Sequence, residues 1–265
     1  MLRTLTRIGV ACTVLAVALT GSTTQAQFAD LEGQFVFDGD IPKLKNKVDK
    51  GDPAAKDAAV CAVSDIPNYT LTINPESKGV RDVFVYVRKP TKVNPELVNA
   101  ELAELVVDQK QCQFIPHSMI VRCKQQVVAK SQDSIPHNIH GINVFNPGFN
   151  FTVGANDREG QKVPIDKANA KPEPLPIKVV CDIHSHMESY WLVVDHPYAA
   201  TTDENGNFKI EGLPVGKNTL TIWHSTTGYL EKGLDVDVKA DGTTLAPMTV
   251  KATPNGDSVK LSLGK

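Results

Sequence analysis

The stretch Val83-Phe84-Val85-Tyr86-Val87 decides the fold class of this chain. It is a short run of β-branched and aromatic residues, which is typical of a β-strand. Apolar residues also recur with a period near two at residues 34–37 and 69–73, between clusters of Gly, Pro, Asn and Asp. We therefore predict a mainly β protein.

Two segments depart from the strand pattern. In residues 94–105, Pro95 is followed by Glu, Leu, Val and Ala, which predicts a short helix with proline in its first turn. Residues 53–63 are the second helix candidate. Helices are thus expected to be a minor part of the fold.

The first 26 residues are typical of a secretory signal peptide. Basic Arg3 and Arg7 precede an apolar stretch, and small polar residues then lead to Ala26. The apolar stretch has about 12 residues, whereas a membrane-spanning helix needs roughly 20. No other uncharged run of the chain approaches that length. We expect an exported, soluble mature protein, periplasmic or extracellular, with no transmembrane segment.

Size and charge limit the remaining possibilities. The segment 27–265 is long for a single β-sandwich, and its length suits two small domains. The formal net charge is −2, and cleavage of a signal peptide that carries two arginines would make it more negative. There is no long basic run or arginine cluster, so we expect no nucleic-acid partner.

Four of the five cysteines lie beyond the signal peptide: Cys61, Cys112, Cys123 and Cys181. Export permits a disulfide bond, but the spacing indicates no particular framework. If Cys181 binds a metal ion, one of the other three stays unpaired. We expect Cys112 to pair with either Cys61 or Cys123, and the sequence does not choose between them.

The segment Cys181-Asp182-Ile183-His184-Ser185-His186-Met187 has the composition of a metal-ligand loop. It offers a thiolate, two imidazoles and a thioether within seven residues. Two histidines, one cysteine and a weak axial methionine form a blue-copper electron-transfer site. The segment Pro136-His137-Asn138 supplies the missing histidine. We therefore predict a copper site formed by His137, Cys181, His184 and Met187, with His186 as the alternative axial ligand.

The order of several short motifs resembles the cupredoxin family. Phe114-Ile115-Pro116, Asp133 and Pro136-His137-Asn138 follow the order of its core motifs, and Cys181-x-x-His184-x-x-Met187 is similar to the ligand loop of amicyanins and other plastocyanin-like proteins. The resemblance implies a Greek-key β-sandwich, placed here at residues 106–195. It also implies that His137 and His184 are imidazole ligands, Cys181 the thiolate and Met187 the axial thioether. Asn138 would connect the two ligand segments.

A second resemblance concerns the rest of the mature chain. Residues 201–210 are expected to form strand, tight turn at Asn205-Gly206, and strand. With the following Gly212-Leu213-Pro214-Val215-Gly216 turn, they resemble the carboxypeptidase regulatory-like, transthyretin-like β-sandwich. Residues 33–39 are similar to the opening strand of that module. We therefore expect a discontinuous second sandwich made of residues 27–105 and 196–265.

The other histidines leave one question open. A second metal site from His117, His140 and His186 requires these side chains to converge, which the sequence does not establish. No nucleophile with a paired base, no glycine-rich phosphate loop and no catalytic pair of carboxylates is recognisable. We therefore do not expect an enzyme.

Together these features favour an exported blue-copper protein that carries single electrons. Its partner is expected to be a redox protein such as a c-type cytochrome or an exported dehydrogenase. One alternative is a copper-free envelope protein in which the second sandwich is the working part, since fold does not fix function. Another is copper storage or delivery, or a non-blue copper enzyme that uses the additional histidines.

Overall fold

The computed structural model describes residues 27–165, 168–256 and 258–264. Within these ranges the regular structure is almost entirely β-strand, arranged in four sheets, with two single-turn helices. The prediction of a mainly β protein is therefore confirmed. The predicted signal peptide, residues 1–26, lies outside the described residues. None of the described helices is long and apolar enough to cross a lipid bilayer.

Two of the sheets come from both ends of the described chain and form what we call the terminal sandwich. Its strands are β1 (Phe28–Phe37), β2 (Phe84–Val87), β12 (Ala199–Thr201), β13 (Asn207–Pro214), β14 (Gly216–His224), β15 (Gly228–Val238), β16 (Thr243–Thr244), β17 (Met248–Asn255) and β18 (Ser258–Leu263). One sheet has the order β13-β1-β17-β18, with β16 also paired to β1, and the other has the order β12-β2-β14-β15. Phe35, Val85 and Leu220 belong to the apolar core that the two sheets share.

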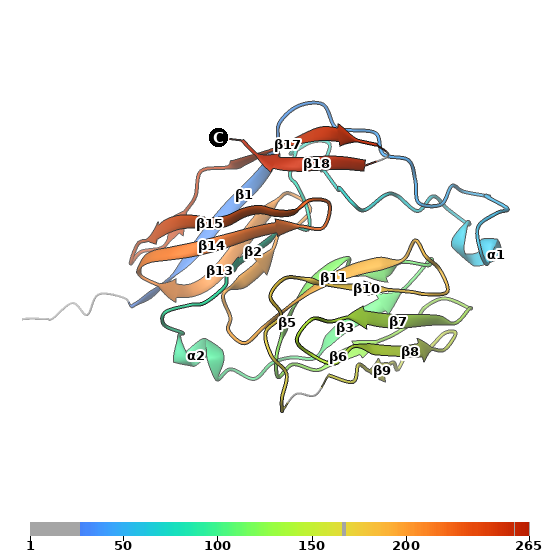
Figure 1. The fold of residues 1–265 in the computed structure, drawn as a ribbon, viewed down its shortest axis with the longest axis horizontal. Helices are drawn as coiled ribbons and strands as arrows, with labels where there is room; N and C mark the ends of the chain where they lie inside the picture. The colour runs from blue at the N-terminus through green and yellow to red at the C-terminus, as the bar shows by residue number, and fades with distance from the viewer. Residues whose placement is uncertain (1–26, 166–167, 257, 265) are drawn as a thin grey trace, which may run out of the picture.

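The other two sheets form the central sandwich. Its strands are β3 (Leu105–Gln109), β4 (Phe114–Ile115), β5 (Ser118–Arg122), β6 (Val127–Ala129), β7 (His137–Ile142), β8 (Phe149–Val153), β9 (Gln161–Lys162), β10 (Ile177–Val180) and β11 (Glu188–Val194). The sheet orders are β5-β11-β10-β7-β8 and β4-β3-β6-β9. Figure 1 shows this sandwich beside the terminal one.

The two sandwiches are joined by a third apolar cluster, and strand periodicity explains it. Side chains alternate between the two faces of a strand. In β11, Trp191 and Val193 therefore face the central core, whereas Leu192 and Val194 face the terminal sandwich. The same alternation in β2 places Phe84 and Tyr86 in this interface and Val85 in the terminal core, so β2 is buried on both faces.

The two predicted helices are much shorter in the structure. The helix α2 covers only Pro95–Val98, and Leu105 already pairs with Val127 as the first residue of β3. No residue of α2 is buried, so there is no apolar face that would stabilise further turns. The helix α1 covers only Ala58–Cys61.

One strand prediction was wrong, and one predicted pair of strands is connected differently from a hairpin. Residues 69–73 form a turn with one isolated bridge, between Ile73 and Val80. The strands on either side of the Asn205-Gly206 turn exist, but they do not form a hairpin. Strand β12 pairs with β2 and strand β13 pairs with β1, so the turn carries the chain from one sheet to the other.

The covering loop, residues 47–66, leaves the terminal sandwich and packs on the central one. Backbone bonds between Val48 and Ile66 close its two ends, and Val48, Cys61, Ala62 and Ile66 belong to the central core. Figure 1 shows its helix α1 beyond the end of β7 and β10, away from β1. The expected division had assigned all of residues 27–105 to the second sandwich, whereas the covering loop within that range packs on the central sandwich. That the terminal sandwich is a carboxypeptidase regulatory-like module stays a prediction.

Candidate metal centre

Three of the four predicted ligands offer donor atoms that converge at one end of the central sandwich. His137 is the first residue of β7, and Cys181 directly follows β10. Because β7 and β10 are antiparallel neighbours, the start of one strand lies beside the end of the other. His184 lies in the connection from β10 to β11, where its carbonyl accepts a hydrogen bond from the Met187 N–H at 2.9 Å. This turn directs the His184 side chain back toward Cys181.

The donor atoms are close together and buried. Nδ1 of His137 lies 3.0 Å from Nδ1 of His184, and Cys181 Sγ lies 3.8 Å from the same His184 nitrogen. Donor atoms of these three residues all lie within 4.8 Å of one another. A single ion with bonds of roughly 2.0–2.3 Å reaches nitrogen and sulfur donors at such separations. The three side chains therefore fit one metal ion.

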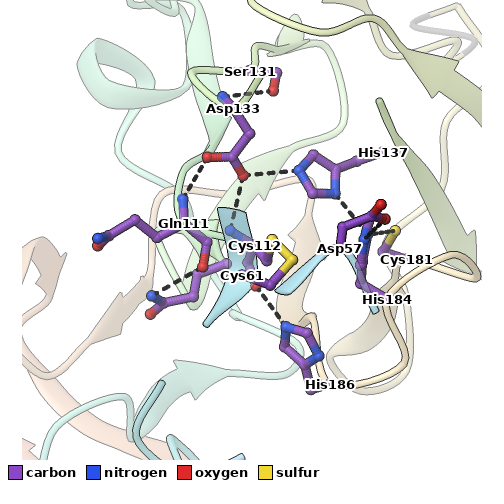
Figure 2. The surroundings of a disulfide bond; sticks show 11 residues. Asp57, Cys61, Gln111, Cys112, Ser131, Asp133, His137, Cys181, His184 and His186 are labelled. Atoms are coloured by element: carbon purple, nitrogen blue, oxygen red, sulfur yellow. Dashed lines mark hydrogen bonds and ion pairs between the residues drawn. A yellow bond between two sulfur atoms is a disulfide. The ribbon is translucent and has the colours of Figure 1, made fainter. Parts of the chain in front are cut away.

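Each imidazole is oriented by a carboxylate on its far side. His137 Nε2 lies 2.8 Å from Asp133 Oδ2, and His184 Nε2 lies 2.9 Å from Asp57 Oδ2. A hydrogen bond at one ring nitrogen fixes the tautomer and the direction of the other. Both rings therefore turn Nδ1 toward the donor cluster. Figure 2 shows Asp133 on the side of the His137 ring that faces away from His184.

The metal-free centre is already charged. Burial raises the pKa of the Cys181 thiol, but hydrogen bonds from the two imidazoles and from backbone N–H groups outweigh burial and lower this pKa to about 6. Burial lowers the pKa of His137, but the bonds to Asp133 and Cys181 raise it to about 9. Both shifts favour a Cys181 thiolate beside a protonated His137. Binding of a cation requires His137 to release a proton.

Asn138 connects the two ligand segments. Its Oδ1 accepts hydrogen bonds from the N–H groups of Asp182 at 2.7 Å and Ile183 at 3.3 Å, and it lies 3.3 Å from Cys181 Sγ. Its Nδ2 donates to Asp182 Oδ2 and to Asn150 Oδ1. These bonds fix the position of the ligand loop relative to the start of β7, in agreement with the role that the resemblance implied for Asn138.

Met187 and His186 differ in their surroundings. Met187 is 1% exposed and belongs to the same apolar core as Cys181. His186 Nε2 lies 3.1 Å from the Cys112 carbonyl oxygen, and burial lowers its pKa. Since the Nε2 of His186 is engaged there, Met187 is the better candidate for the axial ligand.

The disulfide lies against the donor cluster. Cys61 and Cys112 are bonded, which is one of the two expected pairings, and Cys123 is free. Both sulfur atoms lie within 4.8 Å of a His184 ring nitrogen. As members of a disulfide these two cysteines are not thiolates, so the described residues offer the Cys181 sulfur as the thiolate of this cluster.

The three histidines of the possible second metal site do not converge. His117 Nδ1 lies 3.1 Å from the Glu188 carbonyl, His140 bonds to the Asp182 carboxylate, and His186 bonds to Cys112. In the described part of the chain, none of the groups of His, Cys, Asp and Glu that could hold a metal ion includes any of the three. The structure therefore gives no support to a second metal site built from them.

Sequence reasoning missed the two carboxylates. Asp133 precedes His137 by four residues and was noted only as part of a motif, although its spacing was a usable signal. Asp57 is separated from His184 by 127 residues in the sequence. No local pattern links such distant positions, because the contact depends on how the covering loop packs.

Comparison with known proteins adds neighbours for part of the chain. No protein-family model and no curated protein matches it. Solved structures similar to part of it are a Cu-containing nitrite reductase (NirK) from Thermus scotoductus, a novel purple cupredoxin from Nitrosopumilus maritimus and an amicyanin from Paracoccus versutus.

These similarities are partial. The sequence identities are 19%, 18% and 12%, the TM-scores are 0.29, 0.27 and 0.29, and the matches cover 40%, 34% and 41% of this chain. The chain spans 25% of the length of the nitrite reductase, 98% of the purple cupredoxin and 96% of the amicyanin. The assignment of a metal site therefore depends on the residues of this chain.

Proposed function

We propose that this chain is an exported mononuclear copper protein that carries single electrons between redox partners. His137, Cys181 and His184 are the ligands, with Met187 as the axial thioether. The observation that supports this most is the buried convergence of one thiolate and two imidazoles within 4.8 Å. Soft sulfur together with imidazole favours copper over magnesium, calcium or manganese, which prefer oxygen ligands.

The chain's own contribution is to hold the donors in place. A copper ion bound here would supply one-electron redox chemistry. Asp133 and Asp57 fix the two imidazole rings, and Asn138 fixes the ligand loop. Because all these groups are anchored by hydrogen bonds, the two oxidation states would meet nearly the same donor positions. Burial of the donors keeps water from the centre.

One-electron chemistry at this centre implies the class of protein with which the chain would interact. A protein that carries one electron needs another redox protein, and a c-type cytochrome or an exported dehydrogenase would fit. We propose a carrier and not an enzyme, because the Cys181 thiolate and the two imidazoles beside it are the proposed ligands of one metal ion. The proposed export rests on the signal-peptide pattern of residues 1–26.

The first test is the visible and EPR spectrum of the purified mature protein with one equivalent of Cu(II). We expect an intense thiolate-to-copper band and a narrow copper hyperfine splitting in the wild type. Both should be absent in Cys181→Ser and retained in Cys123→Ser, which changes the other buried free cysteine. A weak, ordinary Cu(II) spectrum that neither substitution alters would refute the proposal.

Copper stoichiometry separates the alternatives. One tightly bound copper per chain fits the carrier. More than one would favour storage or delivery, and none would favour a copper-free binding protein.

A further inference from the structure

The covering loop lies directly on the donor cluster. Ala55, Ala58 and Val60 pack against the core that contains Cys181 and Met187. Lys47, at the start of the loop, forms an ion pair with Glu188 at 3.6 Å. The His184 side chain is 0% exposed, although the side chain of its partner Asp57 is 41% exposed. The imidazole edge that bears Nε2 is thus separated from solvent by the Asp57 carboxylate.

The conformation of Asp57 is suited to this contact and not to helix capping. Asp57 stands at the N-cap position of α1, where an aspartate side chain usually accepts a hydrogen bond from the first turn of the helix. Here it makes no such bond, and its backbone is in the left-handed region at φ 54° and ψ 44°. That region is unfavourable for most residues and is tolerated best by Gly, Asn and Asp. The carboxylate is instead directed to His184 Nε2 at 2.9 Å.

The disulfide ties the covering loop to the other side of the centre. Cys61, at the end of α1, is bonded to Cys112. The Cys112 N–H donates to Asp133 Oδ2 at 2.8 Å, and Asp133 orients His137. The same Cys112 accepts a hydrogen bond from His186 through its carbonyl. One crosslink therefore connects the loop that carries Asp57 to the carboxylate that holds the second imidazole, as Figure 2 shows.

We propose that residues 47–66 close the metal centre, with Asp57 as the positioning residue of His184 and the Cys61–Cys112 disulfide as the tether. This inference rests on the proposed function for its biological role, because it deepens that site. The consequence is a centre that small external ligands and chelators reach slowly, and whose His184 edge is not offered to a partner. A bond from a charged carboxylate to a buried ring is stronger than one between neutral groups, so loss of the Asp57 carboxylate should open the site measurably.

The test uses the metal-free mature protein and the reactivity of its two free cysteines. Iodoacetamide modification is followed by mass spectrometry, separately at Cys181 and at Cys123. Both thiols are buried, at 1% and 7% exposure, but Cys123 belongs to the β5–β6 connection and not to the centre. Cys181 thus reports opening of the covering loop, and Cys123 reports general loosening of the central sandwich.

We expect Asp57→Ala to raise the rate at Cys181 about tenfold or more, the change expected for loss of one charge-assisted hydrogen bond. The Cys61→Ala/Cys112→Ala double variant should raise it further, and Asp57→Glu should restore most of the protection. Asp52→Ala is the matched control, because Asp52 lies in the same loop and its carboxylate accepts from the Ala54 N–H. Cys123 should keep its wild-type rate in the single variants Asp57→Ala, Asp57→Glu and Asp52→Ala.

An unchanged Cys181 rate in both Asp57→Ala and the double variant would overturn the proposal, and so would a parallel rise at Cys123 in Asp57→Ala. Because no metal is needed, this result is independent of the copper spectrum. A protein with the expected thiolate-to-copper band but no effect of Asp57 would retain the carrier function and lose the closed centre. A protein without that band but with selective opening at Cys181 would retain the closed site and lose the copper assignment.

Discussion

Asn138 offers a quantitative test of how the ligand segments are held together. Asn138→Ala removes the acceptor for the Asp182 N–H at 2.7 Å and two donated bonds, at 2.8 Å to Asp182 and 2.9 Å to Asn150. It also removes the weaker contact with the Ile183 N–H. Each ordinary hydrogen bond contributes about 1 kcal/mol net to folding.

The expected loss follows from which groups water can reach after the substitution. Asn138 itself is 6% exposed, whereas the Asp182 side chain is 49% exposed and Asn150 is exposed. After the substitution, water can therefore bond to the Asp182 and Asn150 side chains in place of Asn138, but it reaches the Asp182 backbone N–H less well. We expect the free energy of unfolding of the metal-free protein to fall by about 2–3 kcal/mol. In the metal-loaded protein, loss of such support typically weakens binding by about 10- to 100-fold.

Urea unfolding measured by tryptophan fluorescence is the appropriate assay, because Trp191 lies in the central core and stacks on Phe149. Far-UV circular dichroism provides a second probe of the same transition. The matched control is Asn150→Ala, which removes two bonds of the same network from an exposed position and should cost less than about 1 kcal/mol. Equal effects of the two substitutions, or a loss below about 0.5 kcal/mol for Asn138→Ala, would show that Asn138 does not hold the ligand segments.

Two further predictions concern the disulfide and a buried histidine. Cys61 and Cys112 are 51 residues apart, so the chain-entropy relation predicts that the Cys61→Ala/Cys112→Ala double variant loses about 4 kcal/mol in urea unfolding; a loss below about 1 kcal/mol would contradict it. Burial lowers the pKa of His224 to about 4, although the hydrogen bond from its Nε2 to the Arg81 carbonyl acts in the opposite direction. Nδ1 accepts a hydrogen bond from the Thr226 N–H. The unfolded state thus binds more protons between about pH 6.5 and 4, so stability falls as pH falls through that window, by at most roughly 3 kcal/mol. His224→Gln should flatten this dependence in unfolding measured from pH 4 to 7; a wild-type slope in His224→Gln would contradict the assignment.

The strand content and the approach of the ligand segments were accessible from the sequence. A run such as Val83 to Val87 has few alternatives to a buried strand. The three-residue spacing of Cys181 and His184 restricts both to one short loop. His137 joins them because β7 and β10 are antiparallel neighbours, which the resemblance to cupredoxins implied and the spacing alone did not. Whether these residues bind copper is a matter for the spectroscopic test.

Elements whose state depends on tertiary contacts were predicted poorly. Residues 94–105 contain good helix formers, but the helix ends at Val98 and Leu105 pairs with Val127 in a sheet. The Asn205-Gly206 turn resembles a hairpin turn locally. Its flanking strands nevertheless find partners in different sheets. In both cases long-range pairing, which no local pattern encodes, decided the outcome.

The path of the chain has a consequence for how this protein can vary. The chain builds β1 in the terminal sandwich, crosses to the central sandwich for the covering loop, returns for β2, and only then forms β3 to β11. Neither sandwich is therefore a contiguous segment of its gene. A recombination event that transplanted residues 105–194 would move the metal-ligand loop without Asp57 and Cys61. Conversely, substitutions in residues 47–66 can retune the surroundings of His184 while the ligand loop itself stays unchanged.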